Sequence, residues 1–144
     1  MGMNTFEKAA NATYLTVLGQ GQLYGIPLKH VVHIIPVQKI REAPELPFYV
    51  KGKIKHEGTS IPVIDLRLRL GLEETAWDEE TCIVVMYVPA GTVGLLVDAA
   101  GEIKELADGD CKVETEEENP FVLKQCIKNG REIKILDLMK VVKM

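Results

Sequence analysis

An internal repeat constrains the fold of this chain more than any single residue does. The first copy runs from Tyr24-Gly25-Ile26 to Ile61-Pro62-Val63-Ile64-Asp65-Leu66, and the second runs from Val93-Gly94-Leu95 to Ile133-Lys134-Ile135-Leu136-Asp137-Leu138. Gly25 and Asp65 are 40 residues apart, and Gly94 and Asp137 are 43 apart. Apolar runs separated by Gly and Pro predict two small β units of similar topology, each with little core of its own. Such a pair offers a surface for partners more readily than a catalytic cleft.

Size and charge narrow the class of protein. A chain of 144 residues falls within the usual range for one domain and can bury about 70% of its unfolded surface. Its net charge of −4 argues against a general nucleic-acid or anionic-membrane surface, which would carry clustered Lys and Arg. Since no apolar run approaches the roughly 20 residues that span a bilayer, direct membrane insertion is not expected.

The N-terminus and the cysteines indicate the compartment. Residues 1–12, which we expect to be flexible, have neither the basic start nor the apolar core of a signal peptide. Cys82, Cys111 and Cys126 are an odd number and show no Cys-x-x-Cys spacing. This usage fits a reducing compartment and argues against a disulfide scaffold or a thiolate zinc site. We therefore expect a cytoplasmic protein.

Turn residues divide the chain into short strands. The segment Gly19-Gln20-Gly21 predicts a hairpin, and Asn129-Gly130 is the strongest hairpin signal in the chain. Asp65 and Asp137 each follow a strand and are expected to cap a short helical turn. The acidic stretch 73–80 is the expected connection between the two copies. The sequence thus predicts an all-β fold with short helical turns, its main strands at 13–18, 22–26, 33–36, 49–56, 61–64, 82–88, 92–97 and 132–136.

The strand at 51–56 predicts a charged face. Residues along a strand alternate between its two faces, so Lys51, Lys53 and Lys55 project to one side and the residues between them to the other. One face of this strand is therefore expected to be wet and basic.

The histidines, glycines and acidic runs favour structural roles over catalytic, cofactor or metal sites. His30 and His33 are three apart, but their sequence indicates a turn entering a strand rather than one helical face, and His56 is expected to be a solvated strand-end residue. The Gly-Gln-Gly turn lacks the helix and acidic residue of a dinucleotide site. The run Glu116–Glu118 is interpreted as a solvated loop. We expect no cofactor, no metal and no catalytic residue.

Two glycines and a cysteine lie inside strand patterns. Gly25 and Gly94 occupy equivalent positions, where glycine indicates a bulge or a close backbone approach, and Gly94 could also line a binding groove. Cys82 is expected to pack as a small apolar side chain. Trp77, among acidic residues, is interpreted as a loop anchor.

Taken in order, these segments resemble the CheW family of chemotaxis coupling proteins, whose domain also occurs in the CheA histidine kinase and in CheV. The resemblance runs from about Thr13 to Val142 and rests on Leu23-Tyr24-Gly25-Ile26, Phe48-Tyr49-Val50-Lys51-Gly52, Ile61-Pro62-Val63-Ile64-Asp65-Leu66, Val93-Gly94-Leu95-Leu96-Val97-Asp98 and Ile135-Leu136-Asp137. It implies two intertwined SH3-like five-stranded β-barrels, at about 13–71 and 81–142, that share strands. It also implies a non-catalytic adaptor, recruited to membrane-associated receptor arrays.

The resemblance also implies two partners and two sites. The partners are the regulatory domain of a CheA-type histidine kinase and the cytoplasmic tip of a methyl-accepting chemoreceptor. The kinase site would involve Lys51, Gly52 and Lys53. The receptor groove would lie between the barrels and involve Val31, Ile34, Glu57, Cys82, Gly94 and Ile103.

One departure from the family concerns the receptor groove. Where relatives have Asn-Leu-Arg-Gly, this chain has Lys55-His56-Glu57-Gly58, so a positive charge is replaced by a negative one. A diverged adaptor that binds a kinase regulatory domain without typical receptor coupling is therefore an alternative. A small-molecule-binding β-barrel is another, although no convergent polar cluster marks a ligand pocket.

Overall fold

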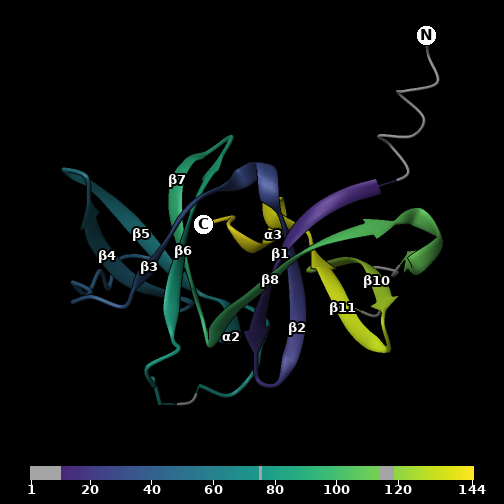
Figure 1. The fold of residues 1–144 in the computed structure, drawn as a ribbon. Helices are drawn as coiled ribbons and strands as arrows, with labels where there is room; N and C mark the ends of the chain where they lie inside the picture. Colours follow the sequence, from purple (N-terminus) through teal and green to yellow (C-terminus); the bar gives the residue numbers. More distant parts are fainter. Residues whose placement is uncertain (1–10, 75, 114–118) are drawn as a thin grey trace, which may run out of the picture.

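The computed structural model describes residues 11–74, 76–113 and 119–144 (Figure 1). Of residues 1–12, which we expect to be flexible, residues 1–10 lie outside the described residues. Residues 11 and 12 belong to the first strand. The elements in chain order are β1 (Asn11–Gly19), β2 (Gln22–Pro27), η1 (Leu28–His30), β3 (Val31–Pro36), β4 (Val50–His56), β5 (Thr59–Asp65), α2 (Leu66–Arg69), β6 (Cys82–Val88), β7 (Gly91–Val97), β8 (Ala99–Ala107), η2 (Asp108–Asp110), β9 (Cys111–Val113), β10 (Val122–Lys128), β11 (Arg131–Leu136) and α3 (Leu138–Val141).

The strands form two sheets, which confirms the predicted all-β fold. One sheet has the order β3-β6-β7-β5-β4 and the other the order β8-β1-β2-β11-β10-β9. The expected five strands are found in the first sheet only, because the three-residue strand β9 adds a sixth to the second. Both sheets are open, since the first and last strands of each order are not paired with one another.

The sheets do not coincide with the two sequence copies. Strand β2, which begins the first copy, pairs in parallel with β11, which ends the second, so that Gly25 lies opposite Ile135. Strand β5, which ends the first copy, pairs in parallel with β7, which begins the second, so that Val63 lies opposite Gly94. Each copy therefore contributes strands to both sheets.

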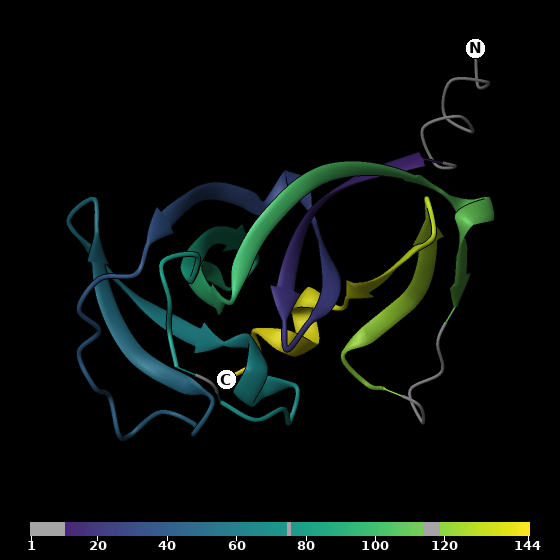
Figure 2. The same cartoon turned by 60° about the horizontal axis from the view of Figure 1, so that its bottom comes forward.

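Three apolar cores hold this arrangement together. The largest includes side chains from both sheets, among them Val17 and Ile26 from one and Ile64 and Leu95 from the other. The short helix α3 belongs to the same core and lies between the sheets (Figures 1 and 2). Two smaller cores pack against one sheet each, around Ile83 in the five-stranded sheet and Ile133 in the six-stranded sheet. Burial of these aliphatic side chains is the main source of stability.

Three hairpins share one turn geometry. In the turns Gln20-Gly21, Glu57-Gly58 and Asn129-Gly130 both residues have positive φ, between 49° and 80°. This is the type I′ turn, whose twist matches that of the flanking strands. The predicted turns at residues 19–21 and 57–60 are therefore two residues long, and the strands continue through the remaining positions.

The predicted helix caps are confirmed, and one of them has a further role. The side chain of Asp65 accepts hydrogen bonds from the backbone N–H groups of Arg67 and Leu68, and that of Asp137 accepts one from Lys140. Asp65 also forms a buried ion pair with Arg67, at 3.2 Å. The Arg67 guanidinium reaches Asp98, at 3.1 Å, and so ties α2 to the segment before β8.

The expectation that the cysteines form no disulfide is wrong for one pair. Cys111 in β9 and Cys126 in β10 are directly opposite each other in the antiparallel ladder and form a disulfide. A pairing of this kind depends on strand register, which cysteine spacing does not reveal. Cys82 is free and buried, as expected.

Candidate functional site

The five-stranded sheet carries exposed apolar side chains on the edge strand β3. Val32 and Ile34 are about half exposed, although apolar residues in edge strands are usually covered. Glu57, in the β4–β5 turn, reaches this strand, and its carboxylate lies 3.5 Å from the imidazole of His33. Val32, His33, Ile34 and Glu57 are called the β3 surface below.

Of the predicted receptor residues, Ile34 lies on β3, and Glu57 reaches the neighbouring residue His33 from the β4–β5 turn. Val31 is the first residue of β3 and is half-buried against the large core. Ile103 is 58% exposed on β8, the edge strand of the other sheet. The two sheets meet where β6 begins, because the Cys82 thiol contacts the backbone of Ala100 in β8.

Cys82 and Gly94 are not on the surface. Cys82 is buried, and this burial raises the pKa of its thiol, an effect partly offset by the hydrogen bond with the backbone of Ala100. Gly94 is buried in the middle of the sheet, and a Cβ there would lie 2.8 Å from Cγ2 of Ile83. Cys82 lies opposite Pro36 of the edge strand β3, whereas Gly94 lies in the central strand β7.

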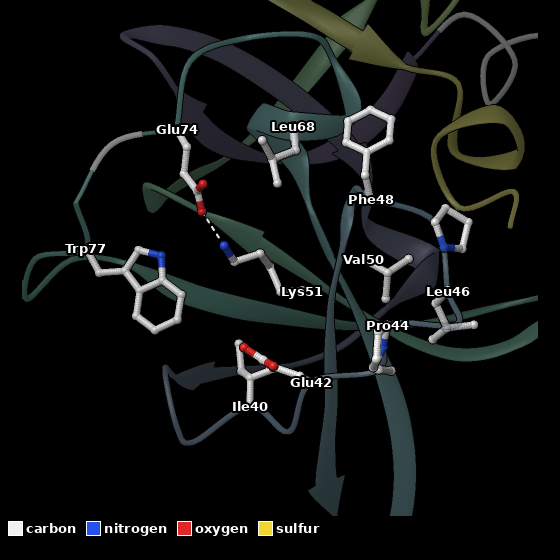
Figure 3. Close-up of a pocket in the computed structure, with 12 residues that line it drawn as sticks. Ile40, Glu42, Pro44, Leu46, Phe48, Val50, Lys51, Leu68, Glu74 and Trp77 are labelled. Atoms are coloured by element: carbon white, nitrogen blue, oxygen red, sulfur yellow. Dashed lines mark hydrogen bonds and ion pairs between the residues drawn. The ribbon is translucent and has the colours of Figure 1, made fainter.

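A second surface is hollowed out beside β4, on the opposite edge of the same sheet (Figure 3). The hollow has a volume of about 520 Å³ and lies between the loop before β4 and the connection after α2. Phe48 is 78% exposed and Trp77 43% exposed. This hollow is called the β4 hollow below. Its lining residues are Ile40, Glu42, Ala43, Pro44, Leu46, Pro47, Phe48, Val50, Lys51, Leu68, Glu74 and Trp77.

The three predicted kinase residues have different roles in β4. Lys51 projects into the hollow and forms an ion pair with Glu74, which lowers the pKa of that carboxyl (Figure 3). Lys53 is half-buried and exchanges two backbone hydrogen bonds with Arg41. Gly52 is structural, because its φ is +146° and a Cβ would lie 2.0 Å from the Arg41 carbonyl oxygen.

The ladder of β4 also departs from simple alternation. A bulge lies between Val50 and Gly52, so that Val50 packs in the large core while Ile54 packs in the smaller core of the five-stranded sheet. Beyond the bulge, half-buried Lys53 and exposed Lys55 alternate with buried Ile54, as predicted. Lys51 lies in the bulge itself, outside this alternation, and its side chain points into the hollow.

Sequence reasoning missed two features of these surfaces. Trp77 lines the β4 hollow together with Phe48, 29 positions earlier. The rings of His33 and His56 lie 5.1 Å apart, next to Glu57. Both groupings depend on contacts between distant segments, which no local pattern reports.

In the described part of the chain the longest helices have four residues, so none could span a bilayer.

Known proteins similar to this chain share its fold and family pattern. A family model described as CheW-like domain matches residues 13–144. The chemotaxis protein CheW of Klebsiella aerogenes is 27% identical over 109 residues, which cover 73% of this chain and 66% of that protein. The chemotaxis protein CheW of Bacillus subtilis is 32% identical over 99 residues, which cover 69% of this chain and 64% of that protein.

A solved structure agrees in fold. The scaffolding protein TtCheW from Thermoanaerobacter tengcongensis superposes with a TM-score of 0.84 at 24% identity, covering 92% of this chain and 93% of that one. The matched stretches of the curated relatives named above span just under two thirds of their length.

Proposed function

Because this chain belongs to the CheW-like domain family, we propose that it is a non-catalytic adaptor that couples chemoreceptors to a CheA-type histidine kinase. An adaptor needs two separate surfaces, so that one partner does not displace the other. The adaptor would act in the cytoplasm, at receptor arrays. None of its residues would take part in making or breaking covalent bonds.

The observation that carries the proposal is the pair of exposed apolar surfaces on one sheet. The β3 surface and the β4 hollow lie at the two ends of the strand order β3-β6-β7-β5-β4. Apolar side chains exposed in such groups are typical of protein interfaces, and aromatic residues such as Phe48 and Trp77 are enriched at binding hot spots. Among the described residues, no further strand pairs with the outer edge of β3, and the outer edge of β4 is paired only at Lys53, with Arg41.

We assign the kinase to the β4 hollow. Lys51 in the hollow and Lys53 beside it on β4 would attract acidic residues of the regulatory domain, while Phe48 and Trp77 would be buried on binding. Gly52 contributes by holding the bulge that directs Lys51 into the hollow.

We assign the receptor to the β3 surface and to Ile103 on β8. Val31 and Ile34 provide apolar contacts, and Glu57 provides the charge that selects the partner. Cys82 would support this surface from inside, because it lies opposite Pro36 of β3 and contacts the backbone of Ala100 in β8. Gly94 would act less directly, by allowing β7 to pack against Ile83 of β6, the strand next to β3.

The test is separate titration of a CheA regulatory-domain fragment and a receptor cytoplasmic fragment against two variants. Phe48→Ser should weaken kinase binding by about tenfold or more and leave receptor binding unchanged, and Ile34→Ser should do the reverse. Each variant is the control for the other, because both remove one exposed apolar side chain, Phe48 from the loop before β4 and Ile34 from β3. If both variants lost both partners, or neither lost either, the two-surface assignment would be wrong.

The exposed carboxylate of Glu57 favours the second candidate, an adaptor that binds a kinase but not typical receptors. A receptor that offers an acidic residue at this position would be repelled. Glu57→Arg should then strengthen binding of a receptor fragment from a typical CheW system and weaken binding of the native one. Equal affinities in all four combinations would place residue 57 outside the interface.

A further inference from the structure

Three possible metal ligands meet at the side of the five-stranded sheet. His33 comes from β3, His56 ends β4, and Glu57 is the first residue of the following turn. One ligand atom from each of the three lies within 4.8 Å of the other two. Within the described ranges, this is where such a group of three occurs.

The three side chains bridge the open seam of the sheet. Strands β3 and β4 are the two ends of the strand order and share no ladder. His33 and His56 nevertheless approach each other across this seam, with ring centroids 5.1 Å apart. The type I′ turn at Glu57-Gly58 fixes the backbone beside them, so that Glu57 is held on the same side as His33.

The distances suit a zinc ion. Ligand atoms on zinc lie about 2.0–2.2 Å from the metal, so two of them in a tetrahedral site are about 3.3 Å apart. Nε2 of His33 and Oε2 of Glu57 are 3.5 Å apart, which is close to that value. Small rotations of the two imidazoles and the carboxylate would bring all three atoms to one centre.

A second observation points independently to a ligand. Nε2 of His56 is inaccessible to solvent and has no hydrogen-bond partner among the described residues. Buried polar atoms in native proteins are almost always paired, so an orphaned imidazole nitrogen requires a partner. A metal ion bound between the two histidines would provide one.

We propose that His33, His56 and Glu57 form a zinc site that joins β3 to the β4–β5 hairpin. Two imidazoles and a carboxylate are a ligand set that zinc accepts, and they leave a fourth position open. His56 and Glu57 also line a hollow of about 270 Å³, which has room for a water molecule in that position. The site shares His33 and Glu57 with the proposed receptor surface, but zinc binding can be tested without receptor or kinase.

Calorimetric titration of zinc chloride into the untagged, metal-free chain tests the proposal. The Cys111–Cys126 disulfide is kept oxidised, so that its sulfur atoms do not compete for the metal. We expect one zinc ion per chain with micromolar affinity, and a rise in melting temperature when zinc is added. Binding should weaken as the pH is lowered, because a metal ion binds only deprotonated ligands.

Variants locate the site. His33→Gln, His56→Gln and Glu57→Gln should each weaken zinc binding by about tenfold or more and abolish the rise in melting temperature. His30→Gln is the matched control, because its Nδ1 lies 3.1 Å from the Tyr87 carbonyl oxygen and it is not in the group of three. It should bind zinc as the unmodified chain does.

The His33→Gln and Glu57→Gln variants still test the proposal if His56→Gln unfolds. His33 and Glu57 have side chains that are 45% and 72% exposed, so their substitution leaves the core intact. The proposal is overturned if the unmodified chain binds no zinc at millimolar concentration. It is also overturned if His33→Gln or Glu57→Gln binds as tightly as the His30→Gln control.

Discussion

At the scale of single residues, the repeated glycines show how tightly the sheets are packed. A Cβ at Gly25 would lie 2.6 Å from Cδ1 of Ile135, and one at Gly94 would lie 2.8 Å from Cγ2 of Ile83. Both glycines face an aliphatic side chain within a filled core, so each is needed to let side chains approach the backbone of its strand.

We predict that Gly94→Ala lowers the free energy of unfolding by about 1–3 kcal/mol, because the added methyl group overpacks the core around Ile83. Gly94→Asp should cost more, since it also buries an unpaired carboxylate. The measurement is urea denaturation followed by circular dichroism. Gly109→Ala is the control, because a Cβ there has no heavy atom within 4 Å; a Gly94→Ala protein as stable as this control would contradict the packing argument.

The two capping aspartates give a matched pair for a second prediction. Asp65→Ala should destabilise the protein by about 2 kcal/mol or more, because it removes both the helix cap and one carboxylate partner of the buried Arg67 guanidinium, which keeps its ion pair with Asp98. Asp137→Ala removes a cap alone, at the equivalent position of the other copy, and should cost about 1 kcal/mol. Thermal and urea denaturation of both variants measure the difference; equal losses would show that the ion pair adds nothing to the cap.

At the scale of elements, strand β4 carries the electrostatic part of the proposed kinase surface. Lys51→Glu combined with Lys53→Glu should weaken binding of a kinase regulatory-domain fragment by about tenfold or more, with little loss of stability. Affinity of the unmodified chain should also fall as salt is added.

Glu74→Gln is the control for this double variant. It removes the partner of Lys51 while the lysine keeps its charge, so kinase affinity should be unchanged or higher. Kinase binding that is insensitive both to salt and to the two charge reversals would contradict the electrostatic role of β4.

Most strands could be predicted from local patterns, whereas their neighbours could not. Asn129-Gly130 determines its own hairpin, and the unbroken apolar run Cys82–Val88 indicates a strand covered on both faces. The cross-strand disulfide and the histidine pair depend instead on register and on the seam between β3 and β4. Such contacts join residues 15 to 23 positions apart, through segments whose path the sequence leaves open.

At the scale of the whole molecule, the repeat predicts two similar units but not the exchange of strands between them. Gly25 lies opposite Ile135 and Gly94 opposite Val63, so each glycine pairs with the closing strand of the other copy. The receptor residues inferred from the family are divided between the sheets, with Ile34 in one and Ile103 in the other. A pairing within each copy would have been equally consistent with the sequence pattern.

Strand exchange predicts that neither half of the chain folds alone. Residues 1–71 contain β2 and β5, but their parallel partners β11 and β7 both belong to residues 72–144. The largest core would also be divided, since it takes side chains from both halves. Each isolated half would expose edge strands and apolar surface and should be largely unfolded.

The test is to produce the two halves separately, record circular dichroism and amide exchange for each, and then mix them. We expect little protected structure in either half and recovery of the native spectrum on mixing, because the missing strands are then supplied from the other half. The control is the full chain cut by a protease at a site introduced between Trp77 and Asp78, in the connection after α2, which should stay folded after the cut. A half that unfolds cooperatively by itself would show that its stability comes from pairing within one copy, contrary to the exchanged topology.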